Sequence, residues 1–179
     1  MYYYGSQNKP FVYRCINRLD RDTTGLTIVA KHALAGGILG NAVAKRAIHR
    51  TYYAVCSGCT PACMRISAPI ARKDASTIER CVDFKHGEYA VTDFIRIKYN
   101  PDNNLSLVKL RLLTGRTHQI RVHMKYIGFP LIGDFLYNPD YTYISRQALH
   151  SGRLVFTHPV TGQKMNLISD IPSDMKSLF

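Results

Sequence analysis

The chain has 179 residues, 24 basic and 12 acidic side chains with a formal net charge of +12, and 46% hydrophobic residues. This length suffices for a domain with its own hydrophobic core, and the composition excludes collagen, coiled coils and intrinsically disordered proteins. No apolar stretch approaches the roughly 20 residues needed to cross a bilayer. We therefore expect one soluble domain, residues 1–179, with no membrane partner.

Acidic side chains are missing from two long segments that are rich in lysine and arginine. The first runs from Thr23 to Lys73 and the second from Asn103 to Gly133. Such basic surfaces attract polyanions, either nucleic acid or an acidic membrane. A membrane role would need a basic amphipathic helix, which we do not find. A solvated basic face without any partner remains the alternative.

The first predicted elements surround one helix. The run LTIVA is typical of a short buried strand, and the next apolar residues recur at helical spacing despite three glycines. Later stretches rich in branched and aromatic residues predict strands, and the last of them alternates between apolar and polar positions. The expected elements are a strand at Leu26–Ala30, a helix at Ala33–Ile48, and strands at Thr51–Val55, Tyr89–Tyr99 and Leu105–Leu112.

The hydrophobic period changes after Thr114-Gly115. Apolar residues then recur at the spacing of a helix, which Gly128 ends. We expect Ile120, Met124 and Ile127 on its apolar face, and His118, Arg121 and Lys125 on a neighbouring polar face.

The last predicted unit is a hairpin. Residues 154–156 and Lys164–Ile168 flank the turn sequence Pro-Val-Thr-Gly at 159–162. Together these elements predict an α+β fold with a mixed, mainly antiparallel sheet and flanking helices.

Two polar segments concentrate residues suited to chemistry. Residues 17–25 read NRLDRDTTG before a strand, and residues 114–121 read TGRTHQIR at a helix start. A carboxylate on the first segment and an arginine on the second could meet, which would favour the ionised acid. An ionised carboxylate shielded from water is a usable nucleophile or base. The alternative is that Asp20 and Asp22 are surface residues paired with Arg18 and Arg21.

Four segments, in order, carry a family resemblance. RLDRDTTGLTIVAK, RTYYAV, LLTGRTHQIRVHMKYIGFPLIGDFLY and LHSGRLVFTHPVTG resemble the RluA family of pseudouridine synthases. The resemblance extends from about Tyr13 to Ile168, which is most of the chain.

The resemblance implies a role for each matching residue. Asp20, in the R-L-D signature, is expected to be the catalytic carboxylate that attacks the uridine. Tyr52 would lie against the uracil and help with proton transfer, and Arg121 would pair with Asp20. Arg18 is expected to enter the space that the target nucleotide leaves. We also expect Arg116 and His118 to bind substrate, although His118 could instead make hydrogen bonds at the helix start.

The implied reaction detaches uracil from its ribose and rejoins it through C5, so we expect no cofactor. The partner would be RNA, ribosomal or transfer, whose target base is extruded and stacked while phosphates contact the basic surface. A catalytically inactive RNA-binding module with this fold is the alternative. We expect a cytoplasmic monomer.

The chain departs from the family pattern at three places. Asn17 stands where histidine is usual and Thr24 where serine is usual, and both changes keep a polar side chain. Relatives usually carry a further strand upstream, with a segment like N-K-P-x-G. Asn8-Lys9-Pro10 is too close to Asp20 to be that element. We therefore expect an N-terminus that is truncated or diverged, with the upstream strand missing.

The cysteines offer a third hypothesis, a zinc-stabilised binding domain. Cys56, Cys59 and Cys63 lie close in sequence, with Cys81 or His86 as a conceivable fourth ligand. The second C-x-x-C of a zinc ribbon is absent, and Cys56 continues a predicted strand. Five cysteines are also an odd number, which argues for reduced thiols in a cytosol. We favour free, partly buried thiols and no metal.

Two further features near the second segment remain open. Asp134 lies in a predicted turn and could support the active loop. Tyr137, Tyr141 and Tyr143 could stack on bases, but we favour a place in the core.

Overall fold

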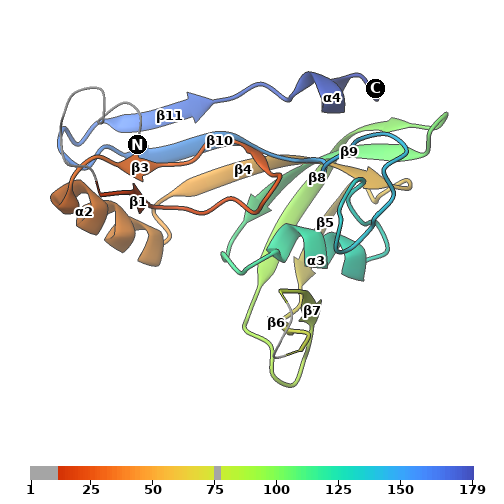
Figure 1. Cartoon of the computed structure of the whole chain (residues 1–179), viewed down its shortest axis with the longest axis horizontal. Coiled ribbons are helices and arrows are strands. Elements are labelled where there is room, and N and C mark those ends of the chain that lie inside the picture. Colours follow the sequence, from red (N-terminus) through yellow and green to blue (C-terminus); the bar gives the residue numbers. More distant parts are fainter. Residues whose placement is uncertain (1–11, 75–77) are drawn as a thin grey trace.

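The computed structural model describes residues 12–74 and 78–179, and its centre is a seven-stranded sheet (Figure 1). The strands that follow one another across this sheet are all antiparallel neighbours. In spatial order they are β11 (Lys164–Ile168), β10 (Leu149–Thr157), β4 (His49–Ser57), β9 (Leu105–Leu112), β8 (Val91–Asn100) and β5 (Cys63–Ser67). The short strand β2 (Thr24–Gly25) adds to β10 in parallel. The predicted α+β fold with a mixed, mainly antiparallel sheet is confirmed.

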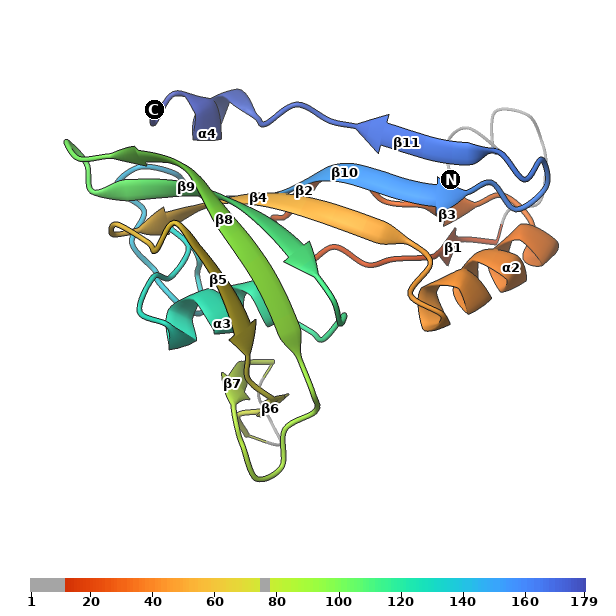
Figure 2. The same ribbon diagram turned by 180° about the vertical axis from the view of Figure 1, so that it is seen from behind.

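Two short strand pairs lie outside this sheet. β1 (Arg14–Cys15) pairs with β3 (Val29–Ala30) near the start of the chain. β6 (Ile70–Arg72) pairs with β7 (Arg80–Val82), and this hairpin projects away from the large sheet (Figures 1 and 2).

Helices cover both faces of the sheet. α2 (Ala33–Ala44) and α3 (Gln119–Tyr126) lie on one side of strands β4 and β10, and the one-turn helix α4 (Ser173–Lys176) lies on the other (Figures 1 and 2). No helix among residues 12–74 and 78–179 is long and apolar enough to cross a membrane.

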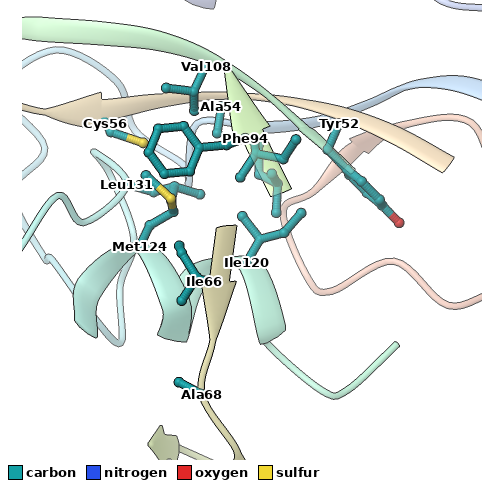
Figure 3. Close-up of a cluster of buried hydrophobic side chains, with 12 residues drawn as sticks. Tyr52, Ala54, Cys56, Ile66, Ala68, Phe94, Val108, Ile120, Met124 and Leu131 are labelled. Atoms are coloured by element: carbon teal, nitrogen blue, oxygen red, sulfur yellow. The ribbon is translucent and has the colours of Figure 1, made fainter. Parts of the chain in front are cut away.

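The core between the sheet and α3 explains how the strands are oriented. Tyr52, Ala54 and Cys56 alternate along β4 onto one face and pack against Ile120 and Met124 of α3 (Figure 3). The intervening β4 residues face a second cluster on the other side of the sheet, where α4 contributes a buried methionine. A third cluster lies beneath α2. Because both faces are covered, packing holds β4 in place, and with it the side chain of Tyr52.

The structure confirms most of the predicted elements and corrects two. β9 has the predicted bounds, Gly128 ends α3 in a left-handed conformation, and the hairpin at the C-terminal end is present. The predicted helix at Ala33–Ile48 ends at Ala44, because Arg46 adopts a left-handed conformation with φ 56° and turns the chain towards β4. The predicted strand at Leu26–Ala30 is reduced to β3, since the Leu26 N–H donates to a β10 carbonyl instead.

Other parts of the chain were not predicted or lie outside the description. Strands β5, β6 and β7 had no counterpart in the sequence analysis. The segment Asn8-Lys9-Pro10, on which the expectation of a missing upstream strand rests, lies outside the described residues.

Candidate active site

A cavity of about 640 Å³ opens between the segment that follows β1, the end of α2, the start of β4 and the start of α3. Six arginines line it, and Asp20 is the only carboxylate among its described lining residues. All six residues singled out from the sequence contribute to this lining: Asp20, Tyr52, Arg121, Arg18, Arg116 and His118. The structure thus brings them together from three separate parts of the sequence.

The loop that carries Asp20 is held by a bond within the loop, by a residue just before β10, and by β10 itself. The Thr23 N–H donates to the Asp20 carbonyl at 3.1 Å, and the Gln147 amide donates to the Thr23 hydroxyl at 2.5 Å. Gly25 has φ +105°, and a Cβ atom there would lie 2.3 Å from the Ser151 carbonyl oxygen. Only glycine permits this close approach of β2 to β10. The loop is therefore a fixed support for Asp20.

Arg121 carries the ion pair at the bottom of the cavity, and its side chain is only 1% exposed. Its Nε and Nη2 donate to the two carboxylate oxygens of Asp134, each at 2.7 Å. The remaining Nη1 reaches Asp20 Oδ2 at 3.4 Å. Burial works to lower the pKa of Arg121, but the hydrogen bonds and charge of Asp134, together with the charge of Asp20, raise it above its ordinary value. Arg121 therefore remains a cation, and its two hydrogen bonds to Asp134 orient its remaining nitrogen towards Asp20.

His118 approaches the same carboxylate from the first residue before α3, where its φ is 57°. Its Nε2 lies 4.0 Å from Asp20 Oδ2, and its Nδ1 lies 2.9 Å from the Tyr137 hydroxyl. That hydroxyl oxygen also accepts the Arg80 N–H at 2.8 Å. We assign the His118 proton to Nε2, because this lets Tyr137 donate to Nδ1 and places the N–H towards the carboxylate.

The surroundings of His118 and Tyr137 shift both pKa values in the direction that this assignment requires. Burial lowers the pKa of His118, Asp20 opposes this effect, and Arg121 adds to it. Burial raises the pKa of Tyr137 to about 12. At neutral pH the imidazole and the phenol are thus both uncharged, as a donor chain from Tyr137 through His118 to Asp20 requires.

Tyr52 forms the wall on the β4 side and is 5% exposed. Its ring belongs to the core cluster, while its hydroxyl points away from the other labelled side chains (Figure 3). Burial raises its pKa above the ordinary value of a phenol, the charge and hydrogen bonding of Arg50 act against this rise, and Asp20 adds to it. The ring is fixed by packing, and the charges of Arg50 and Asp20 act on the pKa of the hydroxyl in opposite directions.

The two arginines expected to bind substrate differ in their surroundings. Arg18 is exposed at the cavity, next to Asp20 in sequence. Arg116 forms an ion pair with Glu88 and donates to the Tyr89 carbonyl at 3.2 Å. The surface-turn alternative applies to Asp22, whose carboxylate accepts from Arg21 at 3.2 Å.

Asn17, at the position where the family usually has histidine, is buried, and the oxygen of its side-chain amide has a structural role. Its Oδ1 accepts the Ile28 N–H at 3.0 Å, which joins the start of the loop to the chain ahead of β3. Its buried Nδ2 has no hydrogen-bond partner among residues 12–74 and 78–179. The substitution therefore keeps the loop attached.

Several supporting residues had only weak signals in the sequence. Asp134 was considered as a support for the loop, but its two-pronged contact with Arg121 was not foreseen. Arg121 was placed on a polar helix face and is instead buried. Gln119 is buried and was missed: its Oε1 accepts from Thr114 Oγ1 at 2.8 Å and from the Arg116 N–H at 2.9 Å, which fixes the start of α3.

Tyr137 is buried, as the favoured core interpretation predicts, whereas Tyr141 and Tyr143 are 51% and 42% exposed, so that interpretation is wrong for them.

The cysteines lie apart from this cavity and are free thiols. Cys56 is fully buried in the β4 core, as expected, and burial raises its pKa. Cys15, Cys59 and Cys63 are exposed rather than partly buried. Within residues 12–74 and 78–179 no three histidine, cysteine or acidic side chains are placed to hold a metal ion.

Comparisons with known sequences all match RNA pseudouridine synthases. The family model for RNA pseudouridylate synthase matches residues 1–126. An uncharacterized RNA pseudouridine synthase of Bacillus subtilis is 47% identical over 92% of this chain and 57% of its own length. Ribosomal large subunit pseudouridine synthase D of Zymomonas mobilis is 37% identical over 92% of this chain and 54% of its own length. The chain thus spans little more than half of these relatives.

Solved structures agree with the sequence comparisons. Human RNA pseudouridylate synthase domain containing 1 superposes with a TM-score of 0.79 at 26% identity and covers 89% of this chain and 69% of its own. Human RNA pseudouridylate synthase domain containing 4 has a TM-score of 0.77 at 20% identity over 98% of this chain and 77% of its own, which shows a shared fold.

Proposed function

The chain belongs to the RNA pseudouridylate synthase family, and on that premise we propose that it isomerises uridine in RNA to pseudouridine, with Asp20 as the reacting carboxylate. The observation that carries this proposal is a single carboxylate in an arginine-lined cavity, 3.4 Å from a buried arginine and in the same cavity as an aromatic wall. A target uracil could lie against Tyr52 with its ribose near Asp20.

The atoms of the proposed reaction balance without an oxidant or reductant. The bond between N1 of uracil and C1′ of ribose breaks, a bond between C5 and C1′ forms, C5 loses its proton and N1 gains one. The protein must supply a carboxylate that stays ionised, a fixed orientation for the detached base and a proton acceptor.

Arg121 and His118 are proposed to hold Asp20 rather than to touch the uracil. The Arg121 cation favours the ionised carboxylate, and the His118 Nε2–H faces the same oxygen. Because Asp134 and Tyr137 fix these two donors from one turn of chain, Asp20 meets the substrate in a prepared geometry.

Tyr52 is proposed to position the base and share in the proton transfer. Burial raises the pKa of its hydroxyl and so disfavours loss of the proton, whereas the charge and hydrogen bonding of Arg50 lower this pKa. The uracil must leave the RNA stack to reach Tyr52, and Arg18 is proposed to occupy the space that it leaves.

The RNA is proposed to be ribosomal or transfer RNA. The relatives from Zymomonas mobilis and Vibrio vulnificus, which are named ribosomal large subunit pseudouridine synthase D, favour ribosomal RNA. This substrate would place the protein in the cytoplasm, where ribosomes are made in bacteria.

Tritium release from RNA labelled at uridine C5 tests the proposal, with RNA from cells that lack the enzyme. We expect release by the unmodified protein and by Asp22→Asn, which removes an exposed carboxylate from the same loop, and none by Asp20→Asn. Equal release by all three proteins would rule out Asp20 as the reacting group. RNA binding without release by any of them would instead indicate a binding module.

A further inference from the structure

The arginines of the cavity differ in whether they have acidic partners. Arg116 pairs with Glu88, and Arg121 pairs with Asp134 and Asp20. Among the described residues, no carboxylate forms an ion pair with Arg18, Arg46 or Arg50, which line the same cavity. Elsewhere on the surface, Arg65 and Arg146 have carboxylate partners. The cavity in which the proposed substrate binds thus holds several arginines without a carboxylate partner among the described residues.

Arg50 enters the cavity from β4. Alternation along the strand places its side chain on the face of Tyr52, two residues further on. Its Nη2 passes over Gly115, where a Cβ atom would lie 3.4 Å from that nitrogen. The guanidinium therefore lies next to the 114–116 loop, and its charge also acts on the Tyr52 hydroxyl. Arg50 is therefore half-buried and directed to the rim of the uracil site.

Arg46 enters the same cavity from the turn that joins α2 to β4. Its left-handed conformation, with φ 56°, is uncommon for a residue other than glycine and ends the helix. The side chain is exposed and lines the cavity four residues before Arg50. Arg111 also lines the cavity, but it pairs across strands with Asp93 and Thr51, on the face away from Tyr52. Its side chain is therefore directed away from the face that carries Arg50 and Tyr52.

We propose that Arg46 and Arg50 form an anion subsite that binds the phosphodiester groups adjoining the target uridine. This inference rests on the proposed function for the identity of the ligand. A guanidinium presents several N–H donors in a planar fork that matches two phosphate oxygens, and two such groups beside the uracil site suit a strand with a phosphate on each nucleotide. The site would therefore discriminate between a nucleoside in a strand and a free nucleoside.

Salt dependence of RNA binding tests the subsite without relying on catalysis. The probe is a fluorescein-labelled oligouridine of nine nucleotides, measured by fluorescence anisotropy over a range of potassium chloride concentrations. Each phosphate contact to a single strand contributes about 0.7 to the slope of log K against log salt concentration. We expect Arg46→Gln and Arg50→Gln each to reduce the slope by about 0.7, and Arg50→Lys to retain most of it.

Arg153→Gln is the matched control. Arg153 is exposed on β10 and does not line the cavity, and within the described part of the chain its side chain bonds only to the Asn166 amide oxygen, so its loss should leave the slope unchanged. Equal slopes for the unmodified protein, Arg46→Gln and Arg50→Gln would overturn the inference. So would an equal reduction in Arg153→Gln, because the effect would then be one of overall charge.

A second comparison keeps this inference separate from the proposed function. Uridine 3′,5′-bisphosphate should compete with the oligonucleotide much better than uridine, and the double variant Arg46→Gln/Arg50→Gln should remove most of that advantage. If the chain shows this pattern but forms no pseudouridine, the subsite stands and the proposed activity fails. If pseudouridine forms but the double variant keeps the full advantage, the subsite is refuted and the activity stands.

Discussion

Of the residues that support the site, Asp134 is the one whose replacement should lower the stability of the protein most. It accepts two hydrogen bonds from Arg121 and two more from the backbone N–H groups of Leu136 and Tyr137. Asp134→Asn keeps the shape but removes the charge, and Asp134→Ala removes every contact. In both variants, among the residues that the structure describes, the buried Arg121 cation has only Asp20 left as an acidic partner, at 3.4 Å.

Burial sets the magnitude of this effect. The Arg121 and Asp134 side chains are 1% and 0% exposed. Removing one partner of a buried pair costs about 3–5 kcal/mol, because the other charge stays in a medium that solvates it poorly. Such a loss is a large share of the roughly 5–15 kcal/mol that stabilises a domain. We expect the full range for Asp134→Ala and a smaller loss for Asp134→Asn, whose amide oxygen can still accept from Arg121.

Urea unfolding measures this loss, and Asp174→Asn is the matched control. Asp174 binds Arg146 through the same two-pronged geometry, at 2.9 Å for both contacts, but its side chain is 43% exposed. Its loss should cost less than about 1 kcal/mol. Equal losses for Asp134→Asn and Asp174→Asn would refute the argument from burial. A folded Asp134→Asn protein should also isomerise uridine more slowly with unchanged RNA affinity, since the charge of Asp134 no longer fixes the orientation of Arg121 towards Asp20.

Three further predictions follow from the supports of the site. Tyr137→Phe removes the hydroxyl that donates to His118, a hydrogen bond that contributes about 0.5–1.5 kcal/mol. Single-turnover kinetics should therefore show a several-fold lower rate, with no change in the Kd for RNA. An unchanged rate would contradict the donor chain. Burial lowers the pKa of His123 in the folded protein, so the unfolded chain takes up the proton first as pH falls below about 6.5, and the folded state loses stability. The urea concentration at the unfolding midpoint should therefore be lower at pH 5.5 than at pH 7.5. In His123→Gln this difference between the two pH values should be smaller. Gly25→Ala should lower thermal stability and activity together, because the new methyl meets the β10 backbone, whereas Gly37→Ala, with open space around it in α2, should preserve both.

The sequence predicted the elements whose hydrophobic pattern is regular. Val108, Leu110 and Leu112 alternate with the basic residues between them, and the bounds predicted for this strand, Leu105–Leu112, are those of β9. The strands β6 and β7, of three residues each, are too short for any period to show and were missed. The end of α2 was also missed, because nothing in the local composition signals that Arg46 would leave the helical conformation.

The sequence identified the members of the site better than their arrangement. Asp20 and Arg121 are 101 positions apart, and only the family resemblance favoured Asp20 over Asp22. That Arg121 directs two of its nitrogens to Asp134 and one to Asp20 depends on how the chain after α3 folds back on the helix, which no local pattern encodes. The subsite at Arg46 and Arg50 likewise appears only once the end of α2 lies beside the start of α3.

The central claim is that Asp20 performs chemistry rather than binding, and one measurement tests it most directly. The same RNA, taken from cells that lack the enzyme, is bound and then converted under single-turnover conditions by the unmodified protein and by Asp20→Asn, and its nucleosides are separated after digestion. We expect pseudouridine only from the unmodified protein, with RNA dissociation constants that agree within about twofold, since the basic cavity is intact in both. Pseudouridine formation by Asp20→Asn at a comparable rate would contradict the account.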